Sequence, residues 1–172
     1  MHPLAALSRL ASQSGAIVNR MKRWLLRAAY ALLTLRRIAW QPVTLGVNVL
    51  LVRDGEVLLV RHTYRAGWFL PGGGVKRHET LEAAARREAR EEVGATIGEL
   101  RLMGAYSDFV EAKSDHVVVF VSESFEQTPN ESAEIAEARF FRFDALPEGV
   151  SAGSQRRIDE YRQPNPSEAG QW

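Results

Sequence analysis

Three glutamates in the middle of the chain have the spacing that gathers carboxylates on one face of a helix. Glu88, Glu91 and Glu92 are three and four residues apart, so a helix that turns by about 100° per residue places them in one stripe. Leu81 and Ala84 fall in the same stripe one to two turns earlier, which predicts that it faces the protein interior. Like charges at this spacing repel one another, and these lie near the negative, C-terminal end of the helix dipole. A bound cation would relieve both effects.

The ligand chemistry indicates which cation. Carboxylate oxygens, in a chain without cysteine, favour Mg²⁺ or Mn²⁺ over zinc. The alternative is a charged surface helix, in which pairs such as Arg87 and Glu91 contribute a few tenths of a kcal/mol each. The run Pro71-Gly72-Gly73-Gly74 shortly before the helix favours the cation, because glycine backbone can approach an ion or a phosphate closely.

The glycine run and the acidic helix together resemble the Nudix box. That signature is a glycine, five residues, a glutamate, seven residues, and then Arg-Glu-aliphatic-x-Glu-Glu-x-Gly-aliphatic. Here Gly73 and Glu79 stand at the first two positions, and residues 87–95 read Arg-Glu-Ala-Arg-Glu-Glu-Val-Gly-Ala. Every charged and glycine position is present, although alanine occupies both aliphatic positions. The resemblance covers residues 42–162.

This resemblance implies an α/β/α sandwich with a mixed sheet, and hydrolysis of a nucleoside diphosphate linked to another moiety. Glu88, Glu91 and Glu92 would hold Mg²⁺, with Mn²⁺ as an alternative, and the carbonyl of Gly72 would be a further ligand. A metal at this place would polarise the diphosphate and lower the pKa of an attacking water. The alternative function is a non-catalytic Nudix module that binds a nucleotide as a regulator or scaffold, whose usual mark would be a broken box.

The resemblance also implies roles for residues around the metal ligands. Glu79 would support the site, and Arg87 would orient the glutamates by ion pairing. The catalytic base would be a box glutamate, Glu88 or Glu91, or a glutamate from a later loop, for which Glu134 and Glu137 are equal candidates. We expect the substrate to meet Gly73 and Gly74. An aromatic side chain such as Trp68, Tyr64 or Tyr106 could stack a base.

The substrate itself is narrowed by elimination. The proline of ADP-ribose pyrophosphatases is absent, since Val110 stands at its distance from the box, and Ala112 stands where diadenosine-polyphosphate hydrolases have a tyrosine. A nucleoside triphosphate or a nucleotide sugar remains. The segment 76–78, Lys-Arg-His, replaces a stretch that is often acidic in the family. Its positive charge either favours a more anionic substrate or belongs to a solvated loop.

The surrounding pattern predicts the elements that would hold these residues in place. Alternating and buried apolar runs predict strands, and Thr80 and Gly94 are placed to cap the acidic helix at its two ends. A closing helix and a frayed tail follow. The expected strands are 44–53, 56–62, 100–107, 116–124 and 139–143, the helices 80–93 and 151–162, and the tail 163–172.

Length and charge divide the chain into parts. At 172 residues it suits one domain with appendages, which we place at 1–40, 41–162 and 163–172. The absence of cysteine excludes disulfides and thiol catalysis. Residues 1–40 carry seven basic and no acidic residues, whereas the rest carries 15 basic and 21 acidic ones. A basic arm therefore precedes an acidic body, and we do not expect DNA binding by the body.

The basic arm has several interpretations. Its apolar run, residues 24–35, is too short to cross a membrane and contains Arg27. The basic pair at 36–37 stands where a signal peptidase would need small residues, so we expect a cytoplasmic protein. The arm could pack on the domain as a helix, or translation could begin at Met21. It could also lie on anionic membrane, which would make the protein membrane-peripheral.

Overall fold

The computed structural model describes residues 43–109, 114–128, 132–164 and 169–172. All of these residues belong to one compact unit, Pro42–Trp172. The predictions made for the basic arm lie outside the described residues. Within the described residues, no helix has both the length and the apolar character needed to cross a membrane.

The elements follow one another as strands with two intervening helices. In chain order they are β1 (Val43–Arg53), β2 (Glu56–His62), β3 (Gly72–Gly74), α2 (Leu81–Val93), β4 (Ala95–Ile97), β5 (Arg101–Asp108), β6 (Ser114–Ser122), β7 (Phe125–Gln127), β8 (Ile135–Arg142), α3 (Ala152–Tyr161) and β9 (Ala169–Gln171).

A mixed sheet forms the middle layer, as the sequence predicted. Its strand order is β8-β2-β1-β6-β5-β9, and β3 pairs with β1 beside this path. The pairs β1–β6 and β5–β9 are parallel, while β1–β2, β1–β3, β2–β8 and β5–β6 are antiparallel. β4 and β7 form a separate two-stranded sheet next to α2.

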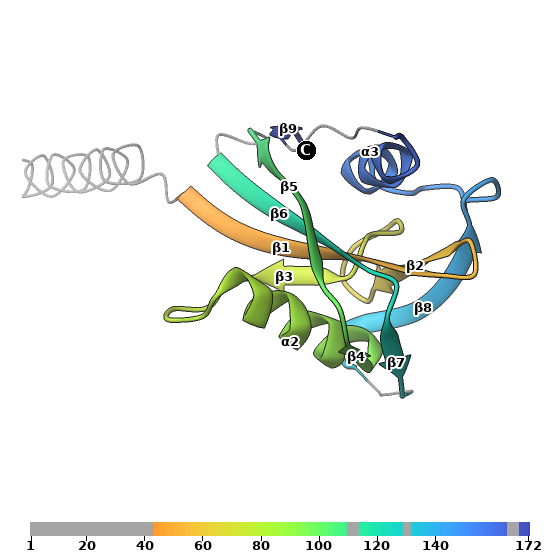
Figure 1. The fold of residues 1–172 in the computed structure, drawn as a ribbon, viewed down its shortest axis with the longest axis horizontal. Helices are drawn as coiled ribbons and strands as arrows, with labels where there is room; N and C mark the ends of the chain where they lie inside the picture. Colours follow the sequence, from red (N-terminus) through yellow and green to blue (C-terminus); the bar gives the residue numbers. More distant parts are fainter. Residues whose placement is uncertain (1–42, 110–113, 129–131, 165–168) are drawn as a thin grey trace, which may run out of the picture. The chain divides into compact units, whose positions relative to one another are not determined.

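The two faces of the sheet carry separate apolar cores. In β1, Val47, Val49 and Leu51 belong to one core, and Leu50 and Val52, which alternate with them, belong to the other. This alternation follows from the two-residue repeat of a strand. The first core packs under α2 through alanines, and the second includes Ile158 of α3. The two helices cover opposite faces, which completes an α/β/α sandwich (Figure 1).

The acidic helix has the caps that its sequence predicted. The hydroxyl of Thr80 accepts a hydrogen bond from Ala83 N, and Gly94 ends the helix with a φ of 66°. A left-handed residue of this kind favours glycine, which lacks a Cβ. The backbone N–H of Gly94 donates to the carbonyls of Ala89 and Arg90. These caps fix where the helix starts and stops, and hence where its glutamates stand relative to β3.

Two expectations from the sequence need correction. β8 begins at Ile135, four residues before the expected start, because it pairs along most of β2. The tail is not frayed throughout: β9 pairs in parallel with β5, and Trp172 packs against Tyr106, with ring centroids 6.3 Å apart. A three-residue strand has no hydrophobic repeat of its own. It forms because the edge of β5 offers unpaired backbone groups.

Candidate active site

Arg87 is the hub of an ion-pair cluster on α2. Its guanidinium binds both carboxylate oxygens of Glu79, at 2.7 and 2.9 Å, in the fork geometry that arginine allows. It also contacts Glu88 at 2.5 Å and Glu91 at 3.2 Å, and donates to the carbonyl of Gly74 at 3.0 Å. One side chain thus ties three box glutamates to the glycine strand.

The same contacts set the charge of Glu79. Hydrogen bonds from Arg87 and from the backbone N–H of Lys76 lower the pKa of the Glu79 carboxyl to about 2. The pKa of Arg87 is raised, chiefly by its hydrogen bonds to Glu79. Both groups therefore stay ionised across the whole physiological pH range, and their ion pair holds the loop that leads into α2 in place.

Glycine is required where β3 faces α2. Gly72 has a φ of 153°, and a Cβ there would lie 2.1 Å from the carbonyl oxygen of Val47. At Gly73 a Cβ would lie 2.7 Å from the carboxyl carbon of Glu88. A side chain at Gly72 would overlap backbone, and one at Gly73 would displace the Glu88 carboxylate, so in this arrangement the glycine backbone and the carboxylates meet directly.

Glu92 is the buried member of the glutamate group. Its side chain is 7% exposed, and its Oε2 accepts a hydrogen bond of 2.8 Å from Gly72 N. Burial raises the pKa of the Glu92 carboxyl to about 7, and the negative charges of Glu88, Glu134 and Glu91 act in the same direction. The Gly72 hydrogen bond opposes the shift without cancelling it.

A neutral histidine lies beside this carboxylate. The Nδ1 of His62 is 4.0 Å from Glu92 Oε1, and it is buried with no hydrogen-bond partner. Burial, reinforced by the charge of Arg65, lowers the pKa of His62, so the ring does not act as a counter-ion at neutral pH. Glu92 therefore lies among negative charges with no cation facing it at close range among the described residues.

These observations meet the requirements of a hard divalent cation. The donors are all oxygens, they repel one another, and one of them is buried at a cost that a cation would remove. In the part of the chain that the structure describes, no three acidic or histidine side chains are already arranged around a common metal position. Arg87 draws Glu88 and Glu91 to one side, while Gly72 holds Glu92. Glu91, at 55% exposure, has room to turn.

The two later glutamates differ in their surroundings. Glu137 is paired with Arg61, whose Nη2 lies 2.8 Å from its carboxylate, so its charge is compensated. Glu134 is exposed just before β8, and its negative charge acts on both Glu92 and His62. The structure thus separates two candidates that the sequence left equal.

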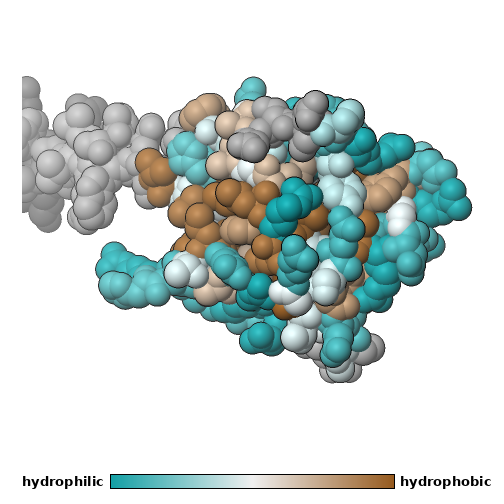
Figure 2. All heavy atoms as spheres, in the orientation of Figure 1, coloured by the Kyte–Doolittle hydropathy of each residue, from teal (hydrophilic) through white to brown (hydrophobic). Residues whose placement is uncertain are grey.

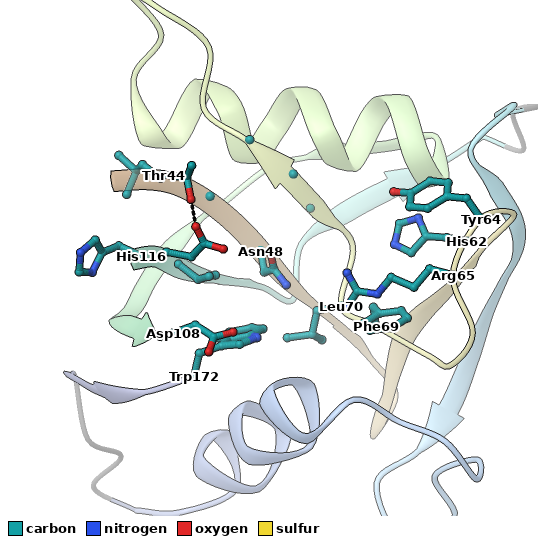
Figure 3. A pocket seen from close by; sticks show the side chains of 17 residues that line it. Thr44, Asn48, His62, Tyr64, Arg65, Phe69, Leu70, Asp108, His116 and Trp172 are labelled. Carbon is teal, nitrogen blue, oxygen red and sulfur yellow. Dashed lines mark hydrogen bonds between the residues drawn. The ribbon is translucent and has the colours of Figure 1, made fainter. Parts of the chain in front are cut away.

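A cavity of about 400 Å³ opens on the other side of the glycine strand (Figure 3). This volume lies within the usual range of small-molecule sites, roughly 300–1,000 Å³. Figure 2 shows apolar side chains gathered in the middle of this face, with hydrophilic residues around them. The lining includes the glycines 72–74, apolar Leu45 and Val117, and polar residues at both ends.

Several cavity residues were not found from the sequence. Asn48, Asp108 and Trp172 come from β1, β5 and the segment after β9, and only strand pairing brings them together. Trp68, a candidate stacking residue, is not among the described residues that line the cavity. It packs edge-on against Phe141, with ring centroids 4.8 Å apart. No sequence motif marks Trp172 as a residue that lines the cavity.

The fold and the site together define a class of protein. An α/β/α sandwich in which a glycine strand faces a helix of glutamates has the chemistry to hold a hard cation beside a phosphate-bearing ligand. The NUDIX domain model matches residues 42–161, and the chain belongs to this family. Nudix hydrolases generally use divalent metals such as Mg²⁺.

Similar proteins differ in what their names say they hydrolyse. An oxidized purine nucleoside triphosphate hydrolase of Danio rerio is 38% identical over 104 residues, 58% of this chain and 66% of that protein. An ADP-ribose pyrophosphatase of Methanocaldococcus jannaschii is 29% identical over 121 residues, 67% of this chain and 71% of the relative. The crystal structure of a MutT Nudix hydrolase from Burkholderia pseudomallei has a TM-score of 0.62 at 26% identity, covering 69% of this chain and 97% of that one. The chain spans slightly less than two thirds of the Danio rerio protein.

Proposed function

We propose that this protein is a Mg²⁺-dependent pyrophosphohydrolase that cleaves a nucleoside diphosphate linked to another moiety. A nucleoside triphosphate or a nucleotide sugar is the proposed substrate. The observation that carries the proposal is the buried carboxylate of Glu92, hydrogen-bonded to Gly72 and repelled by its neighbours. The complete glutamate set around Arg87 favours an enzyme over a non-catalytic nucleotide-binding module.

In this proposal some residues of α2 and β3 hold the cation and others orient its ligands. Glu88, Glu91, Glu92 and the carbonyl of Gly72 would hold the cation. When bound, the cation polarises the diphosphate, neutralises charge that develops on its oxygens and lowers the pKa of an attacking water. Arg87 keeps the carboxylates oriented through its contacts to Glu88 and Glu91, and is itself fixed by Glu79.

The glycine strand brings the substrate to this site. Gly73 and Gly74 line the cavity on one side, and Glu88 contacts Gly73 on the other. Without side chains, β3 allows a phosphate to lie within reach of the helix carboxylates. Glu134 is the preferred base among the later glutamates, because Arg61 compensates the charge of Glu137.

The test is phosphate and pyrophosphate release by the purified protein from nucleoside triphosphates, nucleotide sugars, dinucleotides and capped RNA. We expect release with Mg²⁺, none with EDTA, and a loss of orders of magnitude in Glu92→Gln. Glu82→Gln is the matched control, since Glu82 lies on the same helix but pairs only with Arg86 among the described contacts. Activity that survived both EDTA and Glu92→Gln would refute the proposal. Nucleotide binding without any turnover would favour the regulatory module.

A further inference from the structure

The cavity next to the glycine strand has an aromatic wall that comes from the end of the described chain. Trp172 follows β9 and lines the cavity, close to Asp108 in the view of Figure 3. We propose that Trp172 determines substrate specificity by stacking the base of a nucleotide. This inference rests on the proposed function, because it takes the phosphates of that nucleotide to lie at β3.

The position of the indole is built into α3. Gly153 lies in the first turn of that helix, and a Cβ there would lie 2.3 Å from the indole Nε1 and 2.4 Å from Cε2. Alanine is ordinarily the better helix former at such a place. Glycine at this position lets the ring lie directly on the helix backbone, which leaves it at the edge of the cavity.

Backbone contacts hold the segment that carries the indole. Trp172 N donates to the carbonyl of Ser107 at 2.9 Å, and β9 pairs in parallel with β5. Arg156 donates to the carbonyl of Trp172. These three contacts fix the backbone that carries the ring, and the ring itself packs against Gly153 and Tyr106, so little conformational entropy is lost on stacking.

A buried network of charged and polar side chains packs against the segment that carries Trp172. Arg157 is 2% exposed, lies 3.5 Å above the ring of Tyr106, and is paired with Glu160 at 2.6 Å. Tyr106 donates its hydroxyl to the same carboxylate at 3.1 Å, and Arg157 reaches the carbonyl of Gln171 at 3.4 Å. Arg157 and Gly153 are thus positioning residues for the indole.

The charges of the cavity give the ligand a direction. Asp108 and Asp115 are directly opposed across the β5–β6 pair, and Thr44 donates to Asp115. Opposed like charges destabilise a sheet, and ionised carboxylates only accept hydrogen bonds. Arg65 lies on the opposite side of the cavity, 3.5 Å above the ring of Phe69 (Figure 3). A nucleotide fits with its phosphates toward the glycines and Arg65 and with the N–H groups of its base toward the two aspartates.

The test compares kcat and KM for the four ribonucleoside triphosphates with those for inorganic tripolyphosphate, which has no base. Removing an aromatic stacking partner weakens binding of a base roughly 5- to 150-fold. We expect Trp172→Ala to raise KM for nucleotides by a factor in this range with kcat retained, and thus to collapse the preference for nucleotides over tripolyphosphate. Trp172→Phe should keep most of the preference, and Asp108→Asn should reduce it, because a carboxylate oxygen that accepts from the base is lost.

A double-mutant cycle separates positioning from general damage to the fold. If Gly153 acts only through the indole, Gly153→Ala raises KM in the wild-type background and has no effect in Trp172→Ala. Equal increases of KM for nucleotides and tripolyphosphate, or an unchanged KM in Trp172→Ala, would overturn the inference. Equilibrium binding of nucleoside diphosphates to the same variants gives a second measurement without turnover. Wild-type protein that binds but does not hydrolyse refutes the proposed function alone, and binding that Trp172→Ala leaves unchanged refutes this inference alone.

Discussion

Replacing Glu92 by glutamine should stabilise the metal-free protein while removing its activity. Gln is nearly isosteric with Glu, and its amide oxygen can still accept the hydrogen bond from Gly72 N. What the substitution removes is the buried charge. A carboxyl whose pKa rises from 4.5 to about 7 on folding costs about 3 kcal/mol of stability at a pH above both values.

The direction of the Glu92 pKa shift determines how the free energy of unfolding changes with pH. Because the pKa is higher in the folded state, protonated Glu92 stabilises the fold at pH below 4.5, and that contribution is lost as the pH rises to about 7. In EDTA, the free energy of unfolding of the wild type should therefore fall between pH 5 and pH 8. That of Glu92→Gln should fall less, so the variant should be the more stable protein at pH 8 by up to about 3 kcal/mol.

Urea unfolding at pH 5, 6, 7 and 8 measures the difference, with Glu82→Gln as the control from the exposed part of α2. Adding Mg²⁺ at pH 8 should stabilise the wild type and leave Glu92→Gln nearly unchanged, because a ligand that binds only the folded state raises its stability. A variant that is less stable than the wild type at pH 8, or a difference independent of pH, would show that Glu92 is not a strained buried carboxylate.

Two further substitutions test the glycine strand and the arginine hub. Gly72→Ala should destabilise the fold by several kcal/mol, because its Cβ would overlap the Val47 carbonyl, whereas Gly74→Ala, with nothing within 4 Å, should be close to neutral. Thermal unfolding of both variants measures the difference, and equal melting temperatures would contradict this prediction. Arg87→Lys keeps the positive charge but loses the two parallel hydrogen bonds to Glu79, so kcat should fall about tenfold or more with a smaller change in KM. Steady-state kinetics measure both constants, and a wild-type kcat would mean that the positive charge alone orients the glutamates.

Local patterns in the sequence were sufficient for the elements that hold the glutamates. The Thr80 and Gly94 caps and the apolar stripe predicted α2, and two successive apolar runs predicted β1 and β2, which pair as neighbours. These signals are local because capping, helical periodicity and apolar runs depend on residues close together in the chain. The α/β/α sandwich itself was implied by the resemblance to the Nudix box, and the structure confirms it.

The stripe alone did not reveal how differently its three glutamates are placed. Glu92 is buried against Gly72, Glu88 contacts Gly73, and Glu91 is mostly exposed. Their different environments come from β3, whose Gly72 and Gly73 meet Glu92 and Glu88, whereas Glu91 is left about half exposed. A helical wheel has no information about the element that packs against it.

The sequence by itself determined the family, the acidic helix and the glycine run before it, because each is written in residue types at short, regular spacing; that the run forms a strand came from its pairing with β1. Tertiary structure alone decided that Arg61 compensates Glu137, that Trp68 packs away from the cavity, and that Trp172 lines it. The reason is physical: these outcomes depend on which strand edges and faces pair across 60 residues or more of chain. Pairing at that distance leaves no periodic trace in the residues that take part.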